Sequence, residues 1–444
     1  MVGLEAFLTA YDPSDLPGGS IDLLGFEAGY LFLAEKLLPD LTNVASRPRY
    51  FSVLCTGIRF ADAEASSTAR EQYRRRLESV LRLERLWILA NVLASRRSGN
   101  GQLPTLAIRG IRYAEARVAE VEQKGLRSVT HQYRLLSRQA PYGLVGIYAA
   151  VAERLRMIER KTLTLTQDLG EPLAEAFVRE TKMPKAVERA VREGAKVPVE
   201  TLASWGERSH VSGRPGTKEK ACLYDAAFNR NPTRFRMLSL LRAHPSAGEQ
   251  ETELARMRRI VKAIEREETN RDLLETMRFI LEYENCYRLA LLGLERLLWL
   301  CRVLPAGSIT PKDLGEDAVL GTVADRLPRA YARFRKAMDS GKSHQDEISK
   351  LDNVNTFLAA AADACNDHLA LAHVILDRHR DVQGGKFDRG RRKMPWIQAQ
   401  DGRITLTVGQ SGGQKKEMRL PEELEPHYYR FAAGDQLVKA ACGP

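Results

Sequence analysis

Leucine recurs with helical spacing along most of this chain, and this periodicity constrains the fold more than any other feature. One broad apolar stripe runs from about Thr68 to Ser95, and a second runs from about Arg271 to Leu304. Apolar residues that recur every three to four positions form one face of an α-helix. The pattern predicts a mainly α-helical protein, about two thirds helix. A helix over 271–304 would be about 50 Å long and would need a partner for its apolar side.

Size and composition indicate a folded protein of several parts. The chain has 444 residues, of which 44% are hydrophobic and 28% charged, so it exceeds one ordinary core. Glycines and prolines at 203–233 favour a loop, and Ser246 to Glu249 has capping-box spacing that would start a helix. We expect four consecutive segments: an N-terminal helical region at 1–125, a winged-helix-like unit at 126–200, a helical domain with long helices at 201–383, and a basic loop with a small C-terminal β-hairpin at 384–444.

The formal net charge is +11, from 68 lysines and arginines against 57 acidic residues. Such a balance favours polyanions, because each phosphate that a protein neutralises releases condensed counterions. The six cysteines form no CxxC pair, the N-terminal residues lack a basic signal-peptide region, and the apolar stretch Leu289 to Leu304 contains charged residues. We therefore expect a cytoplasmic protein that binds nucleic acid and does not enter a membrane.

The order of elements between Val129 and Phe177 reads like a winged helix. We expect a supporting helix at 130–137, a turn at 140–143, a helix at 144–156, a hairpin at 157–166 and a further helix that opens at 168–170. The phosphate contacts of this unit would be Arg154, Arg156, Arg160 and Lys161. The helix is rich in small apolar residues that cannot read base edges. Dimerisation or docking is the alternative role of the unit.

A second basic stretch lies near the C-terminus. From Arg378 to Lys393 the chain gathers seven basic residues against two aspartates, followed by Trp396, which offers a stacking surface. The alternating residues around Asp401 and Gly402 predict a type I′ hairpin. The candidate contacts with nucleic acid here are Lys386, Arg389, Arg391, Arg392, Lys393 and Trp396. A solvated loop and an acidic protein partner are the alternatives.

The predicted helix that begins near Thr68 is also basic, with eight arginines against three glutamates between positions 70 and 97. Such a helix face is most often solvated and crossed by ion pairs between neighbouring turns. The functional alternative is a face that follows phosphates.

Motifs that would carry catalysis are weak. Asp363, Asp367 and His373 form the densest group of metal ligands, which would make a metal-dependent nuclease the enzymatic alternative, but His368 and His373 lack the spacing of a zinc helix. Gly341-Lys342-Ser343 ends like a phosphate-binding loop, yet Lys336 stands where that motif needs its first glycine. We expect no cofactor and no metal.

Several short stretches resemble uncharacterised helical proteins encoded beside restriction-like and phage-defence genes in prokaryotes. The resemblance covers under a tenth of the chain and contains no catalytic signature. The stretches are Arg47 to Phe51, Leu83 to Leu86, Tyr142-Gly143, Leu165 to Gly170, Arg378 to Gln383 and Arg391 to Trp396. The resemblance implies one part of a multi-gene system that acts on foreign DNA.

These observations converge on a non-enzymatic DNA-binding subunit that works with other protein subunits, with DNA favoured over RNA. A scaffold or adaptor that holds acidic protein partners is the first alternative, and a metal-dependent nuclease is the second.

Overall fold

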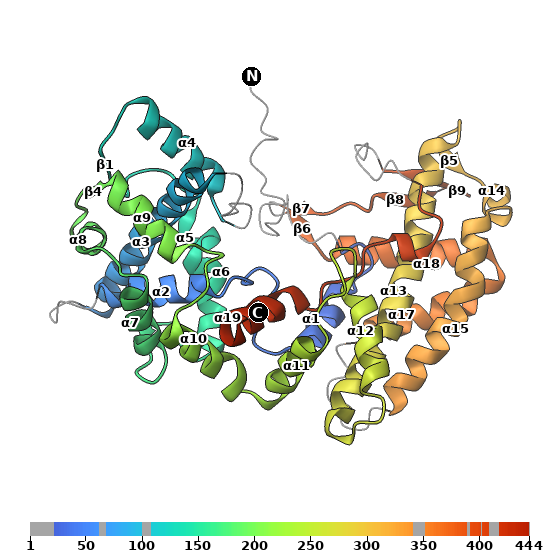
Figure 1. Ribbon diagram of the computed structural model, residues 1–444. Coiled ribbons are helices and arrows are strands. Elements are labelled where there is room, and N and C mark those ends of the chain that lie inside the picture. Colours follow the sequence, from blue (N-terminus) through green and yellow to red (C-terminus); the bar gives the residue numbers. More distant parts are fainter. Residues whose placement is uncertain are drawn as a thin grey trace. The chain divides into compact units, whose positions relative to one another are not determined.

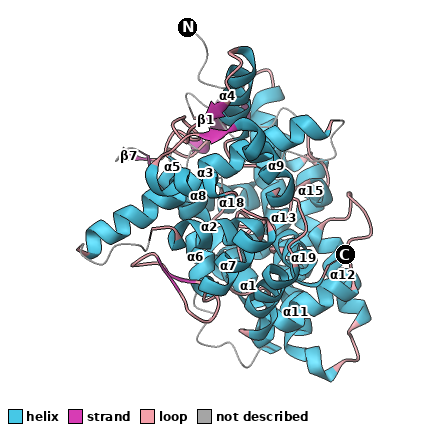
Figure 2. Cartoon of the chain, turned by 60° about the vertical axis from the view of Figure 1, so that its left-hand side comes forward, coloured by secondary structure: helices cyan, strands magenta, loops and turns pink. Residues whose placement is uncertain are grey.

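The computed structural model describes residues 22–61, 68–99, 108–340, 351–388, 391–400, 402–407 and 417–443. Within these ranges the fold is mainly α-helical, as predicted, and the strands are short (Figure 2). None of the described helices is long and apolar enough to cross a membrane. The chain forms two compact units, which cut across the four consecutive segments. Unit 1 comprises the chain up to Leu37 and Ser246–Tyr428, and unit 2 comprises Leu38–Pro245 and Tyr429–Pro444.

Unit 2 is built around the long helix α3 (Ala69–Ser98), whose start at Thr68 matches the prediction. The side chains of Thr68 and Glu71 cap its first turn reciprocally. Most of its apolar stripe is buried, including Trp87, whose indole N–H donates to the carbonyl of Ser209 at 2.7 Å. The helices packed on α3 are α2 (Arg49–Arg59), α4 (Ile111–Gln123), α6 (Leu144–Arg154), α8 (Lys185–Glu193) and α9 (Val199–Ser209).

Residues 203–233, expected as a loop, are largely helical. They include most of α9, all of α10 (Thr217–Tyr224) and the π-helix η2 (Asp225–Asn229), followed by α11 (Pro232–Ala243). The glycines and prolines mark the turns between these helices, and Gly206 lies where α9 approaches α3. A Cβ atom at Gly206 would stand 2.0 Å from the carbonyl oxygen of Ala90. Here glycine permits close helix packing, which composition alone does not distinguish from a loop.

The supporting helix expected at 130–137 is absent: the segment is an irregular stretch fixed to the rest of unit 2 by Tyr133 and Leu135. The Tyr133 hydroxyl donates to the carbonyl of Arg85 at 2.8 Å, and Leu135 is buried. On its N-terminal side, strand β1 (Ser128–Val129) pairs antiparallel with β4 (Val197–Pro198). The remaining elements of unit 2 are α5 (Gln139–Tyr142), β2 (Ile158–Glu159), β3 (Thr164–Leu165), α7 (Gly170–Glu180) and α19 (Phe431–Cys442).

Unit 1 is organised by α13 (Arg271–Val303), which the leucine stripe predicted almost to its ends. It lies side by side with α15 (Ala318–Ser340) (Figure 1). The expected start of a helix at Ser246 is wrong, because α12 begins at Glu253 with Thr252 as its cap. The other helices of unit 1 are α1 (Glu27–Leu37), η3 (Glu268–Asn270), α14 (Pro311–Gly315), α17 (Asp352–Asp363), η5 (Ala364–Asn366), α18 (His368–Gly384) and η6 (Pro421–Glu423).

Two small sheets complete unit 1. Strand β8 (Ile397–Gln400) pairs antiparallel with β9 (Arg403–Leu406), and β9 also pairs with β5 (Ser308–Ile309). Strand β6 (Phe387–Asp388) pairs with β7 (Arg391–Arg392). The residue Asp401, between β8 and β9, lies outside the described part of the chain. The second pair carries the basic stretch that the sequence singled out.

Candidate nucleic-acid interface

The hairpin of β2 and β3 is held firmly to the start of α7. Its register pairs Ile158 with Leu165 and Glu159 with Thr164. The hydroxyl of Thr166 donates to the carbonyl of Arg156 at 2.8 Å and accepts the N–H of Gly170 at 3.0 Å. These bonds connect both ends of the hairpin to the helix that follows.

The backbone of the hairpin is unusual at two residues that are not glycine. Arg156 has φ 59° and the fully buried Leu163 has φ 54°, a region that side chains adopt rarely. The packing of Leu163 against the unit holds this geometry in place. The hairpin is therefore a fixed element of unit 2.

Four basic side chains stand on this hairpin and on the end of α6, as the sequence predicted for their positions. Arg154, Arg156, Arg160 and Lys161 are all exposed. Glu153 accepts the backbone N–H of Arg160 at 3.2 Å. The chain thus places four cations within eight residues of sequence, on one anchored element.

The arginines of α3 are divided between structural and solvent-facing positions. Arg76 donates to the carbonyl of Thr162 at 3.1 Å, near the tip of the hairpin, while Arg82 donates to the carbonyls of Val191 and Arg192 on α8. Arg70 and Arg74 are exposed. The contact between Arg76 and Thr162 shows that the basic end of α3 reaches the hairpin. The two residues are 86 positions apart, so the sequence alone could not indicate this contact.

Helix α6 is fixed at its N-terminus by a buried carboxylate. Glu84 of α3 accepts the N–H of Leu144 at 2.7 Å and an amide N–H of Gln139 at 2.6 Å. Desolvation by burial raises the pKa of Glu84 to about 7. The side of α6 that faces outward carries the exposed Gly146 and the half-buried Val145. Apart from Arg154 at its end, this face offers few hydrogen-bonding side chains for base edges.

The C-terminal basic stretch belongs to unit 1, so it is not part of the hairpin element. Lys386 is half-buried, and its ammonium donates to the carbonyl of Asp22. Desolvation lowers the pKa of Lys386. Arg392 is exposed and Lys393 half-buried. Arg389 lies outside the described residues, and of Arg391 only the backbone, in β7, is described.

Trp396 is positioned by the backbone instead of standing free at the surface. The backbone N–H of Trp396 donates to Nε2 of His379 at 2.9 Å. Its indole ring meets the imidazole edge to face, with the ring centroids 6.3 Å apart. Nδ1 of His379 lies 3.0 Å from the carbonyl of Leu23. Among the six candidates in this stretch, Arg392 and Lys393 are therefore the described side chains best placed for a phosphate.

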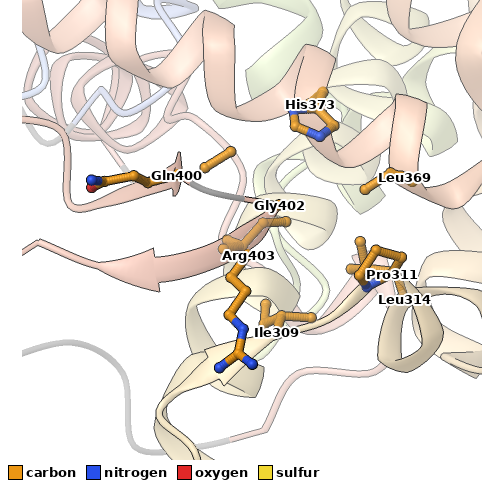
Figure 3. A pocket seen from close by; sticks show the side chains of 10 residues that line it. Ile309, Pro311, Leu314, Leu369, His373, Gln400, Gly402 and Arg403 are labelled. Atoms are coloured by element: carbon orange, nitrogen blue, oxygen red, sulfur yellow. The ribbon is translucent and has the colours of Figure 1, made fainter.

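A small cavity of about 140 Å³ lies in unit 1 between α18, α14 and the β8–β9 pair (Figure 3). Its walls are mainly apolar, with His373 and Arg403 at its edge, and the Arg403 side chain extends away from the imidazole (Figure 3). The other residues of the proposed nuclease site lie elsewhere, since Asp367 caps α18 by accepting the N–H of Leu369 at 2.8 Å. Within the described ranges, no group of three or more His, Cys, Asp or Glu side chains could hold a metal ion.

An aromatic cluster in unit 2 was not expected from the sequence. The rings of Tyr224 and Phe228 stack at 4.7 Å, and Phe235 meets Phe228 edge to face at 6.1 Å. Tyr224 is 38% exposed and Phe235 43%. The spacing of Tyr224 and Phe228 by four residues was a signal for a shared helix face, but the segment had been assigned to a loop.

No protein-family model matches the chain, and neither does any curated protein or solved structure. The functional argument therefore depends on the geometry of the described residues.

Proposed function

We propose that this protein is a non-enzymatic nucleic-acid-binding subunit, with DNA favoured over RNA. The observation that carries the proposal is the anchored hairpin with the end of α6 before it, where Arg154, Arg156, Arg160 and Lys161 are all exposed. A rigid element loses little conformational entropy when its cations meet phosphates. The net charge of +11 adds a long-range attraction for a polyanion.

We further propose that α6, β2, β3 and α7 act as a winged-helix-like unit. Its wing is the β2–β3 hairpin, which makes the main contacts with nucleic acid. Apart from Arg154 at its end, the outward face of α6 has few side chains suited to base edges, so binding through this unit should depend little on sequence. The resemblance to proteins of phage-defence gene clusters supports a role beside other subunits, which would supply specificity and chemistry. On this proposal the protein acts in the cytoplasm against phage or plasmid DNA.

The test is a charge reversal on the wing. The double variant Arg160→Glu and Lys161→Glu should lower the affinity for a 25-base-pair DNA duplex roughly tenfold at 0.1 M salt. The control is Lys185→Glu with Arg189→Glu on α8, which changes the net charge equally at exposed positions. Equal losses in both variants would mean that only net charge matters, and the wing would not be the interface.

An adaptor function is the second candidate, and the outward face of α6 favours it. Gly146 is exposed, and Ile147 and Ala150, three positions apart on one side of the helix, are half-buried, so this side is apolar. Small apolar residues allow close approach of another protein surface. This candidate predicts a complex with a partner protein that survives nuclease treatment and is weakened by Ile147→Gln.

A further inference from the structure

The aromatic cluster of Tyr224, Phe228 and Phe235 lies beside a π-helix, a form that is rare in proteins and frequent at functional sites. The π-helix η2 spans Asp225–Asn229, between the exposed rings of Tyr224 and Phe235. Tyr224 and Phe235 both contact the ring of Phe228 and are themselves exposed. Together they form a surface on which a planar group can stack.

The arginine at the end of this π-helix connects the cluster to the basic hairpin. Arg230 donates to the carboxylate of Asp225 at 3.0 Å and to that of Asp168 at 2.8 Å. Asp168 comes two residues after Thr166, whose hydroxyl bonds to the carbonyl of Arg156 at the base of the hairpin. Arg230 thus connects the π-helix that holds Phe228 to Asp168, two residues after the Thr166 that closes the hairpin, within unit 2.

Charge around the cluster also suits a polyanion. Asp225 and Asp168 both accept from Arg230, and this hydrogen bond and charge hold the pKa of Asp168 below its ordinary value. Glu219 is fully buried and paired with Arg49. Arg230 balances only one of the two aspartates, but residues 214–236 carry six lysines and arginines against two acidic residues, so the segment that holds the rings is net basic.

We infer that the aromatic cluster binds the bases of a single-stranded nucleic acid whose phosphates follow the basic hairpin. This inference rests on the proposed function and names its ligand class. Single strands expose base faces that stack on aromatic side chains, whereas the bases of a duplex are stacked on one another. A protein partner would use the apolar rings as well, but it would not need the adjacent cations of the hairpin.

The test compares a 20-nucleotide oligo(dT) with a 20-base-pair duplex by fluorescence anisotropy. Tyr224→Ala and Phe235→Ala should each weaken oligo(dT) binding about 5- to 100-fold and leave duplex binding unchanged. The dependence of affinity on salt should keep its slope, because no phosphate contact is removed. Tyr224→Trp, which retains a stacking face, should restore binding, and Leu126→Ala, at a similarly exposed apolar residue of unit 2, should have no effect.

The outcomes separate this inference from the proposal on which it rests. Oligo(dT) affinity that is unchanged in both alanine variants would overturn the stacking role while leaving the basic hairpin intact. Equal losses for oligo(dT) and duplex would also overturn it, because they would report a general disturbance of unit 2. A wild-type protein that binds neither oligonucleotide would overturn the proposed function itself, and the cluster would then be a surface for a protein partner.

Discussion

Arg49 donates to the carboxylate of Glu219 at 2.9 Å in the interior of unit 2, where the two side chains are 3% and 0% exposed. The other oxygen of Glu219 accepts the hydroxyl of Ser52 at 2.7 Å, and Arg49 also donates to the carbonyls of Arg208 and Arg214. This ion pair joins α2 to α10. Arg49 lies in the stretch Arg47 to Phe51, most of which is buried, so that stretch serves the core of the unit.

Removing one partner of this pair should destabilise unit 2 severely. We expect Glu219→Gln or Arg49→Met to lower the free energy of unfolding by about 3–5 kcal/mol, because each leaves a buried group without its partner. The double variant should lose less than the sum of the two. Urea denaturation of the wild type, the two single variants and the double variant measures the coupling energy between Arg49 and Glu219. Additive losses of stability would contradict this prediction.

His379 should make unit 1 sensitive to acid. Burial is the main cause that lowers the pKa of its imidazole, and Nε2 accepts the N–H of Trp396, so the folded state holds the ring neutral. A group whose pKa is lowered on folding contributes its full stability above the unfolded pKa, about 6.5 for histidine, and loses it as the pH falls. The midpoint of thermal unfolding should therefore drop between pH 7 and 5.

A substitution separates this effect from general acid unfolding. His379→Gln should be less stable than wild type at pH 7.5 but should lose less stability between pH 7 and 5, because the titrating group is gone. His373→Gln, at an exposed position on the same helix, should follow the wild-type profile. Parallel profiles for wild type and His379→Gln would show that this imidazole does not govern the acid response.

Gly206 should tolerate no side chain. Gly206→Ala places a methyl group 2.0 Å from the carbonyl oxygen of Ala90, so α9 must move away from α3, at a cost of about 1–3 kcal/mol. Gly384→Ala is the control, since its Cβ would meet no atom within 4 Å. The two melting temperatures decide the point, and equal stability of both variants would refute close packing at Gly206.

Lys386 and Arg392 should respond differently to substitution, although both lie in the same basic stretch. Lys386→Met removes the ammonium that donates to Asp22 and should destabilise unit 1 by about 1 kcal/mol without changing nucleic-acid affinity. Arg392→Glu, at an exposed position, should lower that affinity and leave stability unchanged. A loss of affinity in Lys386→Met alone would reverse these roles.

Periodicity predicted the parts of this fold that depend on local sequence. The apolar stripes placed α3 and α13 closely, because a helix that buries one face needs the same spacing whatever its partner. The prediction of a helix at 130–137 failed because the Tyr133 hydroxyl bonds to α3, a long-range contact that the local sequence does not show. Gly206 was misinterpreted for the same reason, since a glycine that permits close packing has the composition of a loop.

The candidate interface was predictable only in its charges. The four cations lie within eight residues of sequence, and the structure shows them exposed at the end of α6 and on the anchored hairpin that follows. The contact of Arg76 with Thr162 and the aromatic cluster beside η2 depend on tertiary packing, which places residues from separate helices together. Lys386 lies in a run of basic residues that predicted a contact with nucleic acid, but its side chain points inward and donates to the carbonyl of Asp22.

The central claim, that the wing of unit 2 binds nucleic acid, is tested most directly by the salt dependence of affinity. The affinity of the wild-type protein for matched duplex DNA, single-stranded DNA and RNA should be measured between 0.05 and 0.3 M salt. We predict binding that weakens steeply with salt, with a slope that becomes smaller in the variant Arg160→Glu with Lys161→Glu. Weak binding that is equal for all three ligands, or a slope that the variant leaves unchanged, would contradict the claim.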